Sequence, residues 1–383
     1  MKQVKKWLPV LMFTLIIFGL TGMGLTAEQK TYSSTEKREL QTRPKAKAKT
    51  IKNGKFQKKY EAYLSDQFPG RDGWVQLQTG VSRLLGKRDS NGVYFGKDHY
   101  LLECYDASDF EEKQMQANLD ALAELVRRTK ERADVKVMMV PTKTWVMQEK
   151  LPLFASTFDE QIFYDKLEEA LGADASDVLV PVTDVLREND DAYIYYRTDH
   201  HWTTRGAAYA YDAYVEAIGG DVKYADNKHT YTVVSDDFYG TTYARVHQAR
   251  QADKIMIYEP KRSLSVVYNM GEKESDSLYE MEHLETEDQY RVFTGGNQPL
   301  LEITGGEKNG RTLMLIKDSF ANCMVPFLAE DFEKLVVVDL RQLNIGCEKL
   351  FDLFAPTDVL VLYNTVQFAK DRDFAEKCVF YGE

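Results

Sequence analysis

The chain has 383 residues, of which 44% are hydrophobic and 28% are charged, as in an ordinary globular protein with one large domain or two small ones. Charge is unevenly distributed: residues 28–59 carry a net charge of +8, and residues 60–383 carry −22. The acidic main part argues against nucleic-acid binding, which requires a basic surface for phosphates.

Residues 1–27 are a targeting element. Three lysines precede an apolar run from Trp7 to about Thr26, which is long enough to cross a bilayer. A cleavable signal peptide is the alternative, but Leu25-Thr26-Ala27 is a poor cleavage site, which favours an uncleaved anchor. The basic N-terminal flank predicts an inside amino end. More basic residues follow the run than precede it, so charge alone leaves the orientation open.

Residues 28–55 read as a basic polar linker, either a solvated tether or a segment that rests on anionic headgroups or an anionic wall polymer. The main domain is expected over 56–383. It begins with two short amphipathic helices, at 56–64 and 74–85, and a hairpin around Val93–Phe95.

Helices and buried strands then alternate, which predicts an α/β domain with a largely parallel sheet. Between about 221 and 308 the pattern changes to a β-rich insertion that could shape a polymer-binding cleft. The expected helices are 110–132, 162–171, 321–332 and 349–354, and the expected strands of the alternating part are 135–140, 178–182, 312–316, 335–338 and 359–362. The strands expected in the insertion are 231–234, 255–258, 264–268 and 290–293.

The densest cluster of reactive side chains is Asp199-His200-His201-Trp202, between an extended run and a helix that starts near Thr203. Extended residues two apart point the same way, so Asp199 is expected beside His201. A carboxylate in that place orients the imidazole and stabilises its cation, as a general base requires. On the same reasoning His200 points away from His201, and Trp202 is a core residue.

The matching nucleophile is Ser319. It follows the apolar strand 312–316 at the turn Asp318-Ser319-Phe320, ahead of a helix. A serine on such a turn exposes its hydroxyl beside backbone N–H groups that can stabilise an oxyanion. A helix N-cap is the alternative role for a single serine.

With these residues in view, the chain resembles the DHHW proteins, in the alginate O-acetyltransferase-type branch of the SGNH hydrolase-like superfamily. One departure is at residues 317–319, which read Lys-Asp-Ser instead of the usual Gly-Asp-Ser, so Lys317 stands in place of the glycine. The matching segments are YLSDQFPGRDGW (63–74), NGVYFGKDHYLLE (91–103), VPTKTWVMQEKLP (140–152), YYRTDHHWTTRGA (195–207), IKDSFAN (316–322) and VVVDLRQLN (336–344).

The resemblance implies a flavodoxin-like three-layer fold and a triad of Asp199, His201 and Ser319. The backbone of Ser319 and the side chain of Asn364 would form the oxyanion hole, although a strand-end turn residue is an equal alternative for Asn364. Arg341, Lys143 and Arg197 are candidates for substrate binding, with solvation or ion pairing as the alternative roles. The histidines and four cysteines lack metal-ligand spacing, so no metal is expected.

The implied activity is transfer of an acetyl group through Ser319 to hydroxyls of an extracytoplasmic polysaccharide, without a bound cofactor. Resemblance alone implies a multipass membrane acyltransferase as the acetyl donor. It also places the domain on the extracytoplasmic face, anchored, or secreted if the signal is cleaved. Two alternatives stay open: an acetylesterase with the same triad, and a non-catalytic glycan-binding or assembly module.

Overall fold

The computed structural model describes residues 2–33, 38–220 and 230–380. The chain forms two compact units. Unit 1 comprises Met1–Asn91 with Ala244–Gln248, and unit 2 comprises Gly92–Tyr243 with Ala249–Glu383.

Unit 1 consists mainly of helices. Helix α1 (Lys2–Thr26) contains an apolar stretch, Trp7–Thr26, with a mean hydropathy of 2.1, and none of this stretch is buried inside the protein. The stretch is long and apolar enough to cross a membrane. A signal sequence would have the same properties. The expected linker, residues 28–55, contains short strands and a short helix. The remaining elements of unit 1 are β1 (Tyr32–Ser33), β2 (Arg38–Glu39), α2 (Ala48–Lys52), α3 (Lys55–Asp66), α4 (Arg71–Leu84) and β3 (Asp89–Ser90).

Unit 2 is built on a seven-stranded sheet in the order β10-β9-β11-β13-β12-β14-β6. The four strands β13, β12, β14 and β6 are parallel, whereas β11, β9 and β10 extend the sheet antiparallel. The α/β class is confirmed, but only this four-stranded part fits the expected parallel sheet. The strands are β6 (Asp134–Val140), β9 (Ser265–Tyr268), β10 (Lys273–Ser275), β11 (Leu300–Thr304), β12 (Thr312–Lys317), β13 (Lys334–Val338) and β14 (Asp358–Asn364).

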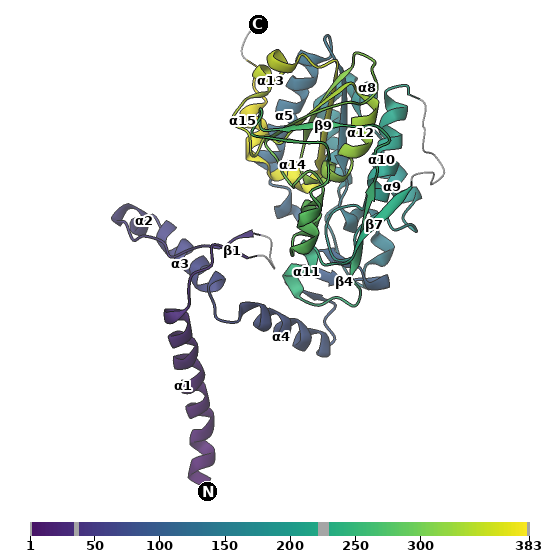
Figure 1. Ribbon diagram of the computed structural model, residues 1–383. Helices are drawn as coiled ribbons and strands as arrows, with labels where there is room; N and C mark the ends of the chain where they lie inside the picture. Colours follow the sequence, from purple (N-terminus) through teal and green to yellow (C-terminus); the bar gives the residue numbers. More distant parts are fainter. Residues whose placement is uncertain (1, 34–37, 221–229, 381–383) are drawn as a thin grey trace. The chain divides into compact units, whose positions relative to one another are not determined.

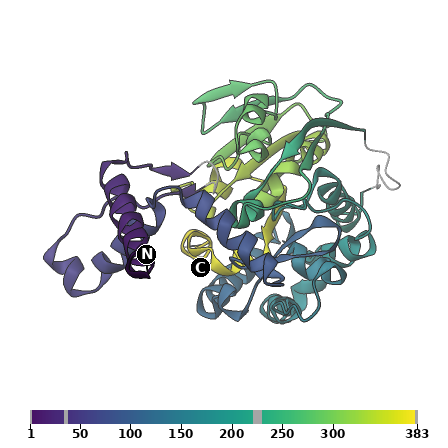
Figure 2. The same cartoon turned by 90° about the horizontal axis from the view of Figure 1, so that it is seen from below.

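Apolar cores lie on both faces of this sheet. Successive strand residues point to opposite faces, so Leu313 and Leu315 of β12 join one core while Met314 and Ile316 join the other. Helices flank both faces (Figure 1, Figure 2). The first core contains residues of α9 (Val182–Glu188), α10 (Thr204–Ala217) and α12 (Val325–Asp331). The second contains residues of α5 (Glu112–Thr129), α7 (Gln161–Leu171), α13 (Cys347–Phe354), α14 (Thr365–Lys370) and α15 (Arg372–Lys377).

Two expected strands are wrong. At 178–182 the chain forms the end of α8 (Ala175–Val178), a single bridge from Leu179 to Val137, and then α9. Pro181 has no N–H to donate, so the pairing stops there. At 290–293 the chain forms a 3₁₀ helix, Gln289–Val292.

The strands of the β-rich insertion are divided between two sheets. Its strands β7 (Tyr231–Phe238) and β8 (Asp253–Tyr258) pair with each other, but β9, β10 and β11 belong to the main sheet. Earlier in unit 2, β4 (Val93–Phe95) and β5 (Leu101–Glu103) form the expected hairpin. The carboxyl ends of the parallel strands, where sites form in α/β sheets, lead into Asp318-Ser319 after β12 and Asn364 at the end of β14.

Candidate active site

The Asp-His-His-Trp segment is a closed bend rather than the extended run expected from the sequence. A bridge joins Tyr195 to Trp202, and the Tyr196 N–H donates to the His201 carbonyl over 3.2 Å. Helix α10 follows, with the Thr203 hydroxyl accepting from the Gly206 N–H as its N-cap. The bend is therefore anchored at both ends by regular structure.

Two buried charged groups hold the bend in shape. The Asp253 carboxylate accepts from the N–H groups of Arg197 and Thr198, at 2.8 and 2.6 Å, and from the Thr198 hydroxyl at 2.5 Å. The Lys143 ammonium donates to the carbonyls of Tyr196 and Asp199, at 3.2 and 2.7 Å. Lys143 is fully buried in these contacts, so its expected role in substrate binding is wrong.

Within the bend, Asp199 lies against His201 as expected, although the geometry that brings them together is different. Asp199 Oδ1 accepts from the His201 N–H at 3.0 Å and lies 2.5 Å from His201 Nδ1. Its other oxygen accepts from the N–H and hydroxyl of Thr241, at 2.7 and 3.0 Å. These four hydrogen bonds orient the carboxylate, and its partner imidazole presents Nε2 on the opposite side.

The Ser319 hydroxyl faces this nitrogen, and the distance between Ser319 Oγ and His201 Nε2 is 2.8 Å. It follows β12 at a turn capped by Asp318, whose two oxygens accept from the N–H groups of Phe320 and Asn364, at 2.9 and 2.8 Å. Burial raises the pKa of the Asp318 carboxyl. Ser319 itself is half-buried and thus partly open to solvent. The expected long helix after it is split into a 3₁₀ turn, Ser319–Cys323, and α12.

Aromatic side chains enclose the imidazole. The Tyr290 ring is stacked on His201, with centroids 4.1 Å apart and planes at 11°, and its hydroxyl donates to the Ser319 carbonyl over 3.2 Å. Trp202 is fully buried, as expected, and its indole N–H donates to the Phe320 carbonyl over 2.7 Å. The nucleophile turn is thus held from both the bend and the insertion.

His200 is not placed as expected. Its ring lies 3.8 Å from that of His201, measured between centroids, instead of pointing away. Its Nδ1 forms a hydrogen bond with the Thr241 hydroxyl over 2.6 Å. The bend accounts for the difference, since only an extended chain separates neighbouring side chains to opposite faces.

Lys317 replaces the glycine of the family pattern without crowding the turn. Its side chain is buried, and its ammonium donates to the side-chain oxygens of Asn297 and Asn322, at 3.1 and 2.8 Å. It also lies 3.6 Å from Asp339 Oδ2. Burial lowers the pKa of Lys317 to about 8. The substitution is therefore accommodated by a polar network away from Ser319 Oγ.

Three further candidate residues have partners within the protein. The Asn364 amide donates to the Val140 carbonyl over 3.0 Å and its oxygen caps α14, which is the strand-end role given as the equal alternative to an oxyanion donor. Arg341 forms a two-point ion pair with Asp339, at 2.8 and 2.6 Å, in line with its alternative role, and substrate binding by this residue stays a prediction. The Arg197 guanidinium stacks on the rings of Tyr100 and Tyr193 and donates to the Asp98 carbonyl, and among the described residues no ion pair joins this guanidinium to an acid at the bend.

The ligand atoms of Asp199, His200 and His201 are close enough together to hold a metal ion. Their hydrogen bonds favour proton transfer instead. Asp199 and His201 Nδ1 already bond each other, and His201 Nε2 faces Ser319. In this arrangement the imidazole can accept a proton at Nε2 and share the resulting charge with the carboxylate.

Several site residues carry no sequence signal. Thr241, Tyr290 and Asp253 lie 42, 91 and 54 positions after Asp199 and belong to no recognisable motif. A hydroxyl or a ring at those positions has nothing to distinguish it before the fold is known.

Comparison with known proteins gives consistent results. The family model described as DHHW protein matches residues 92–338. A protein named probable alginate O-acetylase AlgJ, from Pseudomonas syringae pv. tomato, is 30% identical over 171 residues, which is 42% of each chain. The present chain thus spans less than half the length of that relative.

Solved structures share the fold. A DHHW family protein from Eubacterium siraeum superposes with a TM-score of 0.63 at 24% identity, over 76% of this chain and 95% of that one. PatB1 from Bacillus cereus, solved with a sulfonyl adduct, gives a TM-score of 0.59 at 22% identity, over 73% and 96%.

Proposed function

Because this chain belongs to the DHHW family, we propose that it is a serine-dependent O-acetyltransferase. It would act on the extracytoplasmic side of a membrane and modify hydroxyls of a polysaccharide. The observation that carries the proposal is the continuous hydrogen-bonded chain from Asp199 through His201 to Ser319, with contacts of 2.5 and 2.8 Å. Acetyl transfer and a polysaccharide acceptor are suggested by the name of the AlgJ relatives.

In the first half-reaction, His201 Nε2 takes the hydroxyl proton of Ser319 as Oγ attacks the carbonyl carbon of an acetyl donor. The tetrahedral oxyanion is stabilised by the backbone N–H of Ser319, for which the described residues provide no hydrogen-bond acceptor. His201 then returns the proton to the leaving group, and Ser319 keeps the acetyl group as an ester.

In the second half-reaction, a sugar hydroxyl gives its proton to His201 Nε2 and attacks the acetyl-serine. Collapse of the oxyanion releases the O-acetylated sugar, and the proton returns to Ser319 Oγ. The Asp199 carboxylate stays ionised and stabilises the imidazolium formed in each half. A membrane acyltransferase would supply the acetyl group in this scheme, and α1 would keep the domain at the membrane.

The test uses the full chain in detergent micelles, with p-nitrophenyl acetate as donor and intact mass recorded after brief mixing. We expect release of p-nitrophenol and one added acetyl group, both absent in Ser319→Ala. An arylsulfonyl fluoride should likewise modify the parent and leave Ser319→Ala unmodified. Equal activity in the two proteins would refute the nucleophile, and loss of activity with a chelator would favour a metal at Asp199 and His201.

Acceptors separate transferase from esterase. When alginate or another acetyl-free glycan is added, a transferase moves acetyl groups to the polymer and releases less acetate, whereas an esterase releases acetate regardless of the polymer. The difference depends on how well the site excludes water.

A further inference from the structure

Helix α4 carries an apolar face that points away from its own unit. At about 100° per residue, its exposed large apolar side chains fall within an arc of about 100°. Their exposed fractions run from 46% for Trp74 to 88% for Leu84. We call this set, Trp74, Leu77, Val81, Leu84 and the adjoining Leu85, the apolar stripe.

The opposite, polar face of α4 is the one that contacts the rest of unit 1. Thr79 is buried, and its hydroxyl lies 3.3 Å from that of Ser90. Arg83 donates to the Gln248 side chain over 3.2 Å. An amphipathic helix of a soluble protein has the reverse arrangement, with its apolar face on the core. The apolar stripe is therefore suited to an apolar environment outside the protein.

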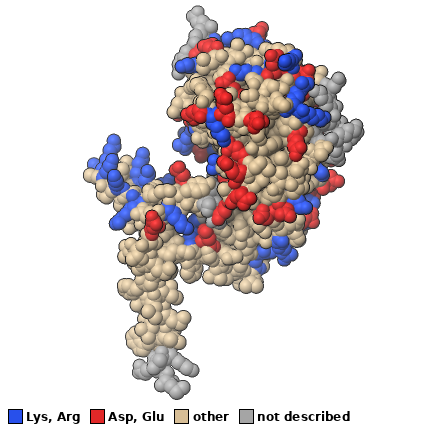
Figure 3. Space-filling view, viewed as in Figure 1, with Lys and Arg blue, Asp and Glu red and all other residues tan. Residues whose placement is uncertain are grey.

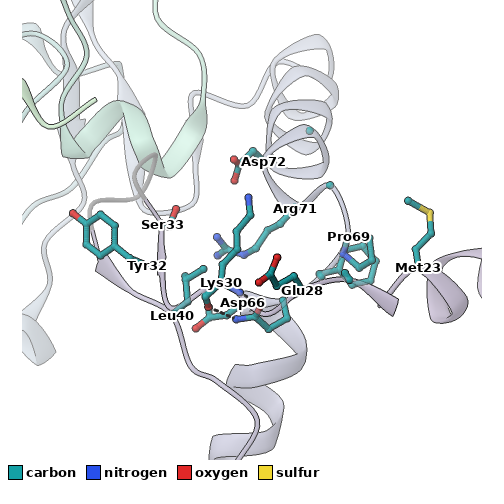
Figure 4. Close-up of a pocket in the computed structure, with 15 residues that line it drawn as sticks. Met23, Glu28, Lys30, Tyr32, Ser33, Leu40, Asp66, Pro69, Arg71 and Asp72 are labelled. Atoms are coloured by element: carbon teal, nitrogen blue, oxygen red, sulfur yellow. Dashed lines mark hydrogen bonds between the residues drawn. The ribbon is translucent and has the colours of Figure 1, made fainter. Parts of the chain in front are cut away.

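The start of α4 lies beside the end of the apolar helix α1. A Cβ placed on Gly24 would be 3.7 Å from Pro69, two residues before α4. Next to this contact is a hollow of about 410 Å³, lined by charged side chains that include Glu28, Lys30 and Asp66 (Figure 4). Within unit 1, α4 runs across the direction of α1 (Figure 1).

This geometry corresponds to the boundary of a bilayer. If α1 crosses the membrane, its last turn ends at the headgroups, and the charged hollow next to Pro69 falls at the same depth. A helix that starts there and runs across the span lies along the membrane surface. Tryptophan is favoured at this depth because its ring is apolar and its N–H is polar. Phe68, whose ring lies 6.3 Å from that of Trp74, extends the apolar surface towards α1.

Charge on the same unit complements anionic lipid. Residues 43–59 contain eight basic residues and no acidic residue. Lys and Arg side chains gather on the part of unit 1 that holds α2 and α3, beside the uncharged surface of α1 (Figure 3). Clusters of this size next to a membrane span attract anionic headgroups.

We propose that the apolar stripe of α4 is embedded in the headgroup region of the bilayer that α1 crosses. Unit 1 then contacts the membrane through two elements: α1, which crosses the bilayer, and α4, which lies on its surface next to the basic residues of 43–59. The proposal rests on the exposed apolar face and is independent of the acetyl-transfer chemistry.

The test uses tryptophan fluorescence of the full chain in lipid vesicles, with acyl chains brominated near the headgroups as quenchers. The chain has four tryptophans, of which Trp7 lies in α1 and Trp202 is fully buried. In a Trp7→Phe protein we expect brominated lipid to quench a fluorescence component that is lost when Trp74→Phe is added. The single variant Trp74→Phe keeps Trp7 and reports insertion of α1.

A second variant, Leu77→Ser/Val81→Ser/Leu84→Ser on the Trp7→Phe background, changes only exposed positions and should fold normally by circular dichroism. We expect it to lose the quenching of Trp74. The proposal is overturned if Trp7 is quenched but Trp74 is equally bright in brominated and plain lipid. That result would assign the apolar stripe to a protein surface.

Discussion

Gly240 provides a test of how closely the site geometry must be kept. A Cβ built on Gly240 would lie 2.1 Å from the Asp199 Cβ and 2.3 Å from Oδ2. Ordinary van der Waals contact begins at 3.4 Å, so Gly240→Ala must push the two segments apart by about 1 Å. Asp199 also depends on the neighbouring Thr241 N–H and hydroxyl for its orientation.

A displacement of about 1 Å at a catalytic group costs about 10²-fold in rate. We therefore expect Gly240→Ala to lower kcat for p-nitrophenyl acetate by about 100-fold, with a small change in KM. Crowding of this kind also lowers the free energy of unfolding by about 1–3 kcal/mol, so rates are measured where circular dichroism shows a folded protein. The rate of modification by an arylsulfonyl fluoride should fall in parallel, because it depends on the same activated Ser319.

The matched control is Gly73→Ala. A Cβ at Gly73, in helix α4, meets no atom within 4 Å, so this variant should keep parental activity. Parental activity in Gly240→Ala as well would contradict the reasoning. It would mean either that the contact with Asp199 relaxes without consequence or that Asp199 does not orient the base.

Three further predictions concern the same site and its surroundings. Asp199→Asn should keep the fold and lower kcat by about 10⁴-fold, because an amide favours the wrong imidazole tautomer; a loss below tenfold in steady-state kinetics would contradict the triad. Tyr290→Leu, which removes both the ring stacked on His201 and the bond to the Ser319 carbonyl, should lower kcat about tenfold, whereas Tyr290→Phe keeps the ring and should lose less; equal losses would assign the effect to the hydroxyl alone. Burial raises the pKa of Glu160 from 4.5 to about 7, so between these values the native state keeps a proton that the unfolded chain has released, and the free energy of unfolding falls by about 2.5 kcal/mol as pH rises from 5 to 8. Urea titrations at the two pH values should show this fall in the parent and a smaller one in Glu160→Gln; parallel curves would contradict it.

The reactive residues could be found from the sequence because each occupies a position with a local rule. Ser319 follows an unbroken apolar strand and precedes a helical segment, and such a turn exposes a side chain at the carboxyl edge of a sheet. Asp199 and His201 are close in the chain, so almost any compact conformation brings them together. The expected extended conformation was wrong. The pairing was still predicted correctly, because the bend also brings the Asp199 carboxylate next to the His201 imidazole.

Charged residues near the site were harder to assign, because a charge in the sequence does not reveal its partner. Lys143 and Arg341 resemble substrate-binding groups until the structure places Lys143 against two backbone carbonyls and Arg341 on Asp339. Asn364 looks like an oxyanion donor at a strand end, but its side chain caps the helix that follows. Each assignment depended on contacts between segments far apart in sequence, which local patterns do not encode.

The same limit applies to the sheet. Apolar strands followed by helices predict parallel neighbours, and this holds for β6, β12, β13 and β14. The strands of the insertion were predicted without intervening helices, although helix α11 (Thr241–Val246) lies between β7 and β8. Nothing local decides whether these strands pair among themselves or join the main sheet. In the structure β11 adds antiparallel to β13, and the chain just before β11 carries Tyr290 onto His201. The insertion therefore completes the site by supplying Tyr290, whose ring packs against the His201 imidazole. The parallel strand β12 leads into the nucleophile, Ser319.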